Sequence, residues 1–136
     1  MKHWFLSLCV ALAALCNATL AHANEFSDLR GKLSAARESL VTMMLNKDKR
    51  GADQQKLVKD TADAVSAHLA KLKAPAGKEA QMKELAETWA AFKKTREVDL
   101  VPAILAGKED EARKLAGGIQ KERITKCQQL VGELGG

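Results

Sequence analysis

Apolar residues near the middle of the chain recur at helical spacing, and their series ends on an arginine. The stripe steps by three and four positions through Met82, Leu85, Trp89 and Phe92, which places it on one face of an α-helix. The next step on that face is Arg96. An arginine on a core-facing stripe is costly unless something anionic meets it. Arg96 is therefore the leading candidate for a binding residue.

Similar stripes predict four helices, over residues 27–46, 52–73, 78–106 and from just after Gly107 to about Glu133. Ser27 is the expected N-cap of the first helix, and the turns fall on residues 47–51 and 74–77. No alternating run of β-branched residues indicates a strand. Helices of about twenty residues with short connections predict an all-α fold, an antiparallel up-down-up-down four-helix bundle. The stripes of the other three helices are Phe26, Leu29, Leu33, Ala36, Leu40, Met43 and Met44; Val58, Ala62, Val65, Leu69 and Leu72; and Ala112, Leu115, Ile119, Arg123 or Ile124, Cys127, Leu130 and Leu134.

Two interruptions are expected within these helices. Pro102 lies inside the third and removes one internal hydrogen bond, which predicts a kink near Val98 or a break. The pair Gly117-Gly118 lies in the middle of the fourth helix and weakens it. A close approach of a neighbouring helix is the expected compensation for this pair.

Residues 1–23 read as a signal peptide rather than as part of the fold. Lys2 precedes a run from Trp4 to Leu15 that is apolar except for Ser7, and Ala21-His22-Ala23 fits a small-x-small cleavage site. The run is shorter than the roughly 20 apolar residues of a membrane span. An uncleaved anchor is the alternative. Cleavage would leave residues 24–136 as one domain in the periplasm.

The composition of residues 24–136 excludes several classes of function. They carry 21 Lys and Arg against 17 Asp and Glu, with the two signs interspersed, and no Tyr. The expected partners therefore do not include nucleic acid, which needs a concentrated basic patch or a stacking platform. Cys127 is the one cysteine in residues 24–136, because Cys9 and Cys16 lie in the leader. No disulfide can therefore form within these residues, and we expect a buried thiol.

Motifs for catalysis or for a resident metal or cofactor are missing from the sequence, so we expect a protein that is not an enzyme and carries neither. There is no nucleophile elbow, phosphate loop or dinucleotide glycine pattern. His68 has no metal-binding residue at the fourth position beyond it. Clustered carboxylates such as Glu109-Asp110-Glu111 are expected to be solvated.

The second half of residues 24–136 contains the series Thr88-Trp89, Phe92, Thr95-Arg96, Pro102-Ala103-Ile104, Gly107-Lys108, Glu111-Ala112 and Gly118-Ile119-Gln120-Lys121-Glu122-Arg123. This series resembles the four-helix-bundle sensor domain of bacterial methyl-accepting chemoreceptors. The resemblance implies a periplasmic bundle, often dimeric, that receives small molecules between its helices, in chemotaxis. Family members continue into a membrane helix and signalling modules, whereas this sequence stops at Gly136. We therefore expect a free-standing binding or accessory protein whose partners include a small organic anion, a membrane receptor or kinase, and a second copy.

Two other functions compete with this interpretation. Periplasmic four-helix b-type cytochromes are similar in size and in a Gly-Lys-x-x-Glu-Ala start to the last helix, matched here from Gly107. That alignment puts Cys127 near the position of their haem histidine, while the familiar His and Met pair is not in place. A structural or chaperone-like helical protein without a small ligand is the third possibility.

The predicted ligand-binding residues are Trp89, Arg96 and Arg123. Arg96 can hold a carboxylate through two parallel hydrogen bonds, pair with Asp99, or extend to the surface. Arg123 lies on or beside the stripe of the last helix, about 7 Å from the height of Arg96 if the helices are antiparallel. Trp89 serves either as core or as part of a ligand cage.

The leader generates the first test. We expect the exported protein to begin at Asn24, because cleavage follows Ala23. Intact-mass measurement on protein recovered from the periplasm checks this. Recovery of the chain with residues 1–23 attached, in the membrane fraction, would contradict it.

Overall fold

The computed structural model describes the backbone of residues 2–135 and side chains from residue 23 onward, and all its regular elements in that part are helical. The all-α prediction is confirmed. Four rods make up the fold, two of them interrupted. Their elements are α1 (Lys2–Leu45), η1 (Lys47–Lys49), α2 (Ala52–Lys71), α3 (Glu79–Thr95), η2 (Arg96–Leu100), α4 (Val101–Leu105), α5 (Glu109–Gly117) and α6 (Ile119–Leu134).

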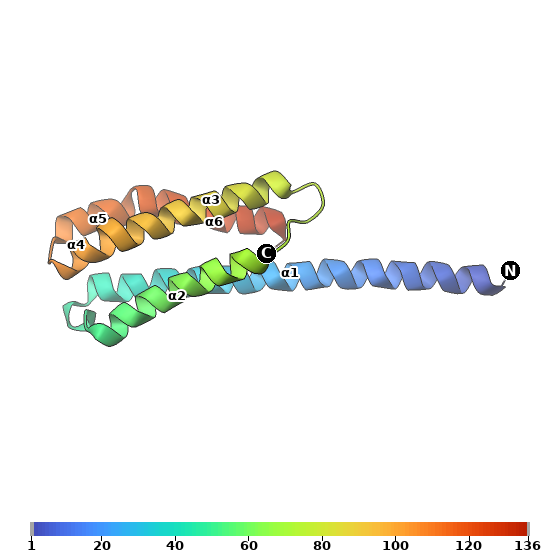
Figure 1. The fold of residues 1–136 in the computed structure, drawn as a ribbon, viewed down its shortest axis with the longest axis horizontal. Coiled ribbons are helices and arrows are strands. Elements are labelled where there is room, and N and C mark those ends of the chain that lie inside the picture. Colours follow the sequence, from blue (N-terminus) through green and yellow to red (C-terminus); the bar gives the residue numbers. More distant parts are fainter. Residues whose placement is uncertain (1, 136) are drawn as a thin grey trace.

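The four rods pack as two pairs. Helix α1 lies along α2, and α3 lies along α6, while α1 also meets α6 where the pairs face each other (Figure 1). The turns around η1 and between α4 and α5 lie at the same end of the molecule (Figure 1). This end is called the closed end below.

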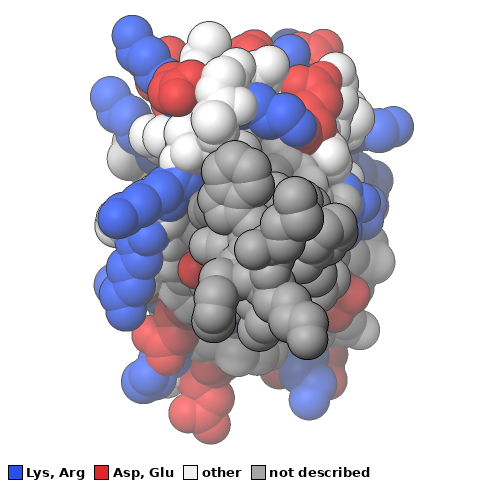
Figure 2. Space-filling view, turned by 90° about the vertical axis from the view of Figure 1, so that its right-hand side faces the viewer, with Lys and Arg blue, Asp and Glu red and all other residues white. Residues whose placement is uncertain are grey.

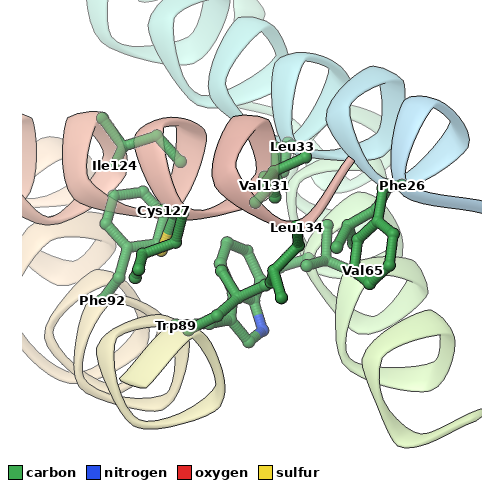
Figure 3. Close-up of a cluster of buried hydrophobic side chains, with 14 residues drawn as sticks. Phe26, Leu33, Val65, Trp89, Phe92, Ile124, Cys127, Val131 and Leu134 are labelled. Atoms are coloured by element: carbon green, nitrogen blue, oxygen red, sulfur yellow. The ribbon is translucent and has the colours of Figure 1, made fainter. Parts of the chain in front are cut away.

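Most residues of the predicted stripes form the core, which divides into two clusters. Ile119, expected on the stripe of the last helix, is instead 42% exposed, because it directly follows the break at Gly118. The larger cluster lies toward the end opposite the closed end, where the rings of Trp89 and Phe92 are 5.3 Å apart (Figure 3). The smaller lies at the closed end. Buried Cys127 belongs to the larger cluster, as expected. The larger cluster comprises Phe26, Leu29, Leu33, Ala36, Ala62, Val65, Leu85, Trp89, Phe92, Ile124, Cys127, Leu130, Val131 and Leu134, and the smaller Leu40, Met43, Val58, Leu100, Ala103, Ile104 and Ala112.

The first helix begins earlier than the sequence predicted. α1 runs through Ser27 without interruption, so the predicted N-cap at Ser27 is wrong. The preceding residues are rich in Ala and Leu, which favour continuation of a helix. The predicted signal peptide falls almost wholly on residues whose side chains lie outside the described part, so its cleavage stays a prediction. None of the described helices is both long and apolar enough to cross a membrane.

The irregularity predicted near Val98 is present, in the form of a π-helical turn. Pro102 has no N–H to donate to the carbonyl one turn earlier. The backbone widens over Arg96–Leu100, and the N–H of Val101 donates to the carbonyl of Arg96, five residues back. Such turns are inserted singly into α-helices, often at functional sites. Here the π turn begins at Arg96, so the residues after Arg96 are rotated about the helix axis relative to the stripe before it.

The glycine pair divides the last rod into α5 and α6, for a reason other than the one predicted. No neighbouring atom lies within 4 Å of a Cβ built on Gly117. A Cβ on Gly118 would lie 2.8 Å from the carbonyl oxygen of Lys114, in the preceding turn of the same rod. The expected close approach of another helix is therefore wrong, and Gly118 is required by the backbone of the break itself.

An arginine fastens the closed end. Arg50 donates through Nε to the carbonyl of Met43 (3.1 Å) and through Nη2 to that of Met44 (3.0 Å). Its Nη1 reaches the carbonyl of Ile104 and Oε1 of Glu109, both at 3.0 Å. The pair ties the η1 turn to the start of α5. Glu109 is thus half-buried and ion-paired, which corrects the expectation that it is solvated.

Elsewhere the surface carries both signs of charge. Viewed from the end from which α1 projects, both acidic and basic side chains lie around the rim of the molecule (Figure 2). Several pairs span one helical turn, as between Lys83 and Glu87. This distribution is typical of solvated helix faces.

The Arg50–Glu109 pair generates a pH-dependent prediction. Hydrogen bonding to Arg50 lowers the pKa of Glu109 in the folded protein. A lowered folded-state pKa contributes stability above the unfolded-state value that is lost as pH falls through the folded value. Glu109→Gln should therefore be less stable than the wild type at pH 7, and the difference should shrink below about pH 4.

Urea unfolding at a series of pH values measures this difference. Asp110→Asn, at the exposed neighbour on α5, is the matched control and should show a smaller effect at pH 7. A gap between wild type and Glu109→Gln that is constant with pH would show that the carboxylate charge does not matter.

Candidate functional site

The guanidinium of Arg96 is enclosed in the bundle and bound by protein groups. The residue is 1% exposed. Its Nη1 donates to the carbonyl of Ala36 on α1 (2.7 Å), and its Nη2 to the carbonyl of Val58 on α2 (2.8 Å). Nη2 also lies 3.4 Å from Oγ of Ser39. Arg96 thus connects the α3–η2 rod to both helices of the opposite pair.

The electrostatics of Arg96 are set by burial. Burial lowers the pKa of its guanidinium to about 10, opposed by the nearby charge of Glu97, so the group stays positive at neutral pH. Among the described residues no carboxylate is ion-paired with it, and the alternative pair with Asp99 is not formed. Carbonyl oxygens occupy the places in which the sequence predicted an anion. The prediction that Arg96 binds a ligand stays a prediction, tested below.

Arg96 belongs to a polar layer between the two core clusters. Oγ of Ser39 shares a hydrogen bond with Oγ1 of Thr61 (2.9 Å) and donates to the carbonyl of Ala36 (3.0 Å). On the other side of the bundle, Nε2 of buried Gln120 donates to the carbonyl of Phe92 (2.9 Å). Each of these buried side chains thus has at least one hydrogen-bond partner within the protein, as is usual for buried polar groups.

Arg123 binds a different set of groups from Arg96. Its Nη1 donates to Oγ1 of Thr95 (2.8 Å) and Oε1 of Gln120 (3.1 Å), and lies 3.4 Å from the carbonyl of Ala91. These contacts join α6 to α3, whereas those of Arg96 join η2 to α1 and α2. The structure therefore does not bring the two arginines to one site.

Trp89 is a core residue with a satisfied indole. It is 3% exposed, and its Nε1 donates to Oγ of Ser66 on α2 at 2.9 Å. One edge borders a hollow of about 510 Å³ between α2 and α3–η2. The cation Lys93 in that hollow is already neutralised by Asp63 (3.2 Å) and Glu97 (2.8 Å).

Cys127 and His68, the residues considered as ligands of haem or a metal, lie in environments that do not favour ligation. Burial raises the pKa of the Cys127 thiol to about 12, whereas the thiolate is the form that ligates metals. A ring nitrogen of His68, Nε2, lies 3.0 Å from the carbonyl oxygen of Glu25. In the described part of the chain, no group of three or more His, Cys, Asp or Glu side chains is placed to hold a metal ion.

A groove that the sequence did not predict lies between α1 and the α5–α6 rod. Its volume is about 450 Å³. The floor is apolar and draws on both core clusters, while the edges carry cations and neutral polar groups. The lining residues are Arg37, Leu40, Val41, Met44, Phe92, Leu100, Arg113, Ala116, Gly117, Gln120, Lys121, Ile124, Thr125 and Gln128.

The charge of this groove is of one sign. Arg37, Arg113 and Lys121 line it, and its lining contains no Asp or Glu. All three cations are exposed, and among the described residues none takes part in a hydrogen bond or ion pair. Lys93 and Lys126, by contrast, pair with carboxylates of neighbouring helices. The groove therefore presents positive charge above an apolar floor, partly offset at Arg113, whose charge acts on nearby Glu109.

The sequence contained only a faint signal for this groove. Arg113, Gly117 and Lys121 follow one another at intervals of four, which places them on one face of a helix with a small residue between the cations. Arg37 lies far from them in sequence and off the stripe of its own helix. Only the packing of α1 against α5–α6 brings the three together.

Comparison with protein-family models, curated proteins and solved structures finds no match for this chain. The geometry and charge of the groove are therefore the basis for assigning a function.

The contacts of Arg96 generate a stability test. Arg96→Met keeps much of the length and apolar volume but removes the guanidinium. Hydrogen bonds to charged groups contribute about 1.5–3 kcal/mol, so we expect a loss of roughly that size in urea unfolding. Arg123→Met should lose less stability, because Arg123 is only half-buried and the groups it leaves unpaired are closer to solvent.

The opposite result would revive the ligand prediction. If Arg96→Met is as stable as the wild type or more so, desolvation of the buried charge outweighs its hydrogen bonds. Arg96 would then be a residue kept for a bound anion.

Proposed function

We propose that this protein is a non-enzymatic, periplasmic binding protein whose antiparallel up-down-up-down four-helix bundle holds a small organic anion. The groove between α1 and α5–α6 is the proposed site. The observation that carries the proposal is the set of three unpaired cations, Arg37, Arg113 and Lys121, around an apolar floor without a carboxylate.

The size and lining of the groove suit a small ligand. Ligand pockets commonly have volumes of about 300–1,000 Å³ and combine apolar walls with a few polar groups, and this groove falls within that range. Leu40, Phe92 and Ile124 can cover the apolar part of a ligand. Cations at the edge can pair with its acidic groups, and Arg does so with two parallel hydrogen bonds.

The side chains around the groove are suited to holding a ligand rather than transforming it. Besides the cations, the polar side chains that line the groove are two amides and a hydroxyl, those of Gln120, Gln128 and Thr125. Nε2 of Gln120 is already engaged with the carbonyl of Phe92. We therefore propose binding without catalysis.

The position of the groove offers a route to signalling. A ligand in it would touch α1 on one side and α5–α6 on the other, and so would strengthen contact between the two helix pairs. We propose that a membrane receptor or kinase, or a second copy of the chain, reads this change, in line with the resemblance to chemoreceptor sensor domains. The proposed periplasmic location depends on cleavage of the leader.

The groove generates a binding test by thermal shift. A ligand that binds only the folded state raises the melting temperature. In a panel of organic acids at low ionic strength, we expect acids with an apolar body to raise it in the wild type. The triple variant Arg37→Gln, Arg113→Gln, Lys121→Gln should abolish the shift.

A matched control separates site from net charge. Lys114→Gln, Lys71→Gln and Lys73→Gln together remove the same number of positive charges from outside the groove and should leave the shift in place. If no acid shifts the wild type, the protein is not a binder of this class. A structural helical protein is then favoured, or a cytochrome if the purified protein shows a Soret band.

A further inference from the structure

We infer that the groove takes an elongated dianion, an apolar chain with an acidic group at each end. This inference rests on the proposed function and specifies the ligand class of the same site. It follows from the way in which the cations are distributed along the groove.

One cationic end lies at the closed end of the bundle. Arg113 lines the groove and also an adjoining pocket of about 160 Å³, together with Met44, Lys47, Arg50 and Glu109. The carboxylate of Glu109 is held by Arg50, and the charges of Lys47 and Arg113 act on it as well. Three cations therefore face one acid in this pocket, which leaves positive charge for a ligand.

The other cationic end lies further along both rods. Arg37 precedes Met44 by seven residues on α1, a rise of about 10 Å, and Lys121 follows Arg113 by eight residues, or about 12 Å. Gln128 and Thr125 border the groove beyond Lys121. Arg37 and Lys121 thus lie about two helical turns from the end marked by Arg113.

The part between the two ends is apolar. Leu40 and Leu100 belong to the smaller core cluster and line the groove there, while Ile124 lies three residues beyond Lys121 on α6. On the α5 side the small residues Ala116 and Gly117 line the groove, so a ligand there can approach the helix backbone. A polar ligand centre would meet few partners over this floor, whereas a methylene chain or a ring would cover it. Acidic groups would meet cations at either end.

The test measures the affinities of four probes for the full chain by calorimetry at low ionic strength. Octanedioate has two acidic ends and an apolar middle, octanoate has one acidic end, butanedioate has two acids without the middle, and 1,8-octanediol has no charge. We expect octanedioate to bind best, exceeding octanoate by up to about fivefold, the range for an exposed ion pair. The diol should bind worst.

Two variants assign the ends. Arg113→Gln should lower the affinity for octanedioate to that for octanoate and leave octanoate nearly unchanged, because a monoacid can use the other end. Arg37→Gln should act in the same way at its own end. Lys114→Gln, next to Arg113 but outside the groove lining, should change neither affinity. Unfolding curves confirm that each variant is folded.

The outcomes separate this inference from the proposed function. If octanedioate and octanoate bind equally well, or Arg113→Gln weakens both alike, the dianion assignment is overturned while anion binding stands. Butanedioate binding as well as octanedioate would overturn the role of the apolar middle. If none of the four probes binds, both the inference and its premise are contradicted.

Discussion

The buried guanidinium of Arg96 is the contact on which the arrangement of the rods depends. It donates to the carbonyls of Ala36 and Val58, one in each helix of the first pair. Its position at the start of the π turn joins this role to Pro102, whose missing N–H favours the irregular backbone there. A charge without a paired carboxylate is unfavourable in a core. Hydrogen bonds to two carbonyls and to Ser39 offset that cost.

The two helix pairs meet through this polar layer and the clusters on either side of it, which leaves room at the edges where they face each other. Between α1 and α5–α6 the break at Gly118 separates Arg113 from Lys121 along one side of the groove. The Arg50–Glu109 pair holds the closed end of the same groove together. The structural contacts and the proposed site are thus adjacent, and a ligand there would act on the interface between the pairs.

Much of the fold followed from the sequence because helical periodicity is a local property. The stripes of Leu29, Val65 and Leu130 are buried as their spacing required, and Pro102 marked the irregularity within one turn. Ser27 failed as an N-cap because nothing in the residues before it ends a helix. The Gly117-Gly118 pair marked a break correctly, but its steric reason lies in the backbone of Lys114, which the residue pattern does not show.

The site was harder to predict because the role of a charged side chain depends on which groups, often distant in sequence, lie next to it in the fold. The sequence by itself determined that Arg96 faces the core, since its place on the stripe follows from helix geometry. Only the tertiary structure decided that carbonyls of α1 and α2 meet it, and that Arg123 turns instead toward Thr95. Arg37, Arg113 and Lys121 are unremarkable surface cations in the sequence. They face one groove because packing sets α1 beside α5–α6, and no local pattern encodes which charges that packing leaves unpaired.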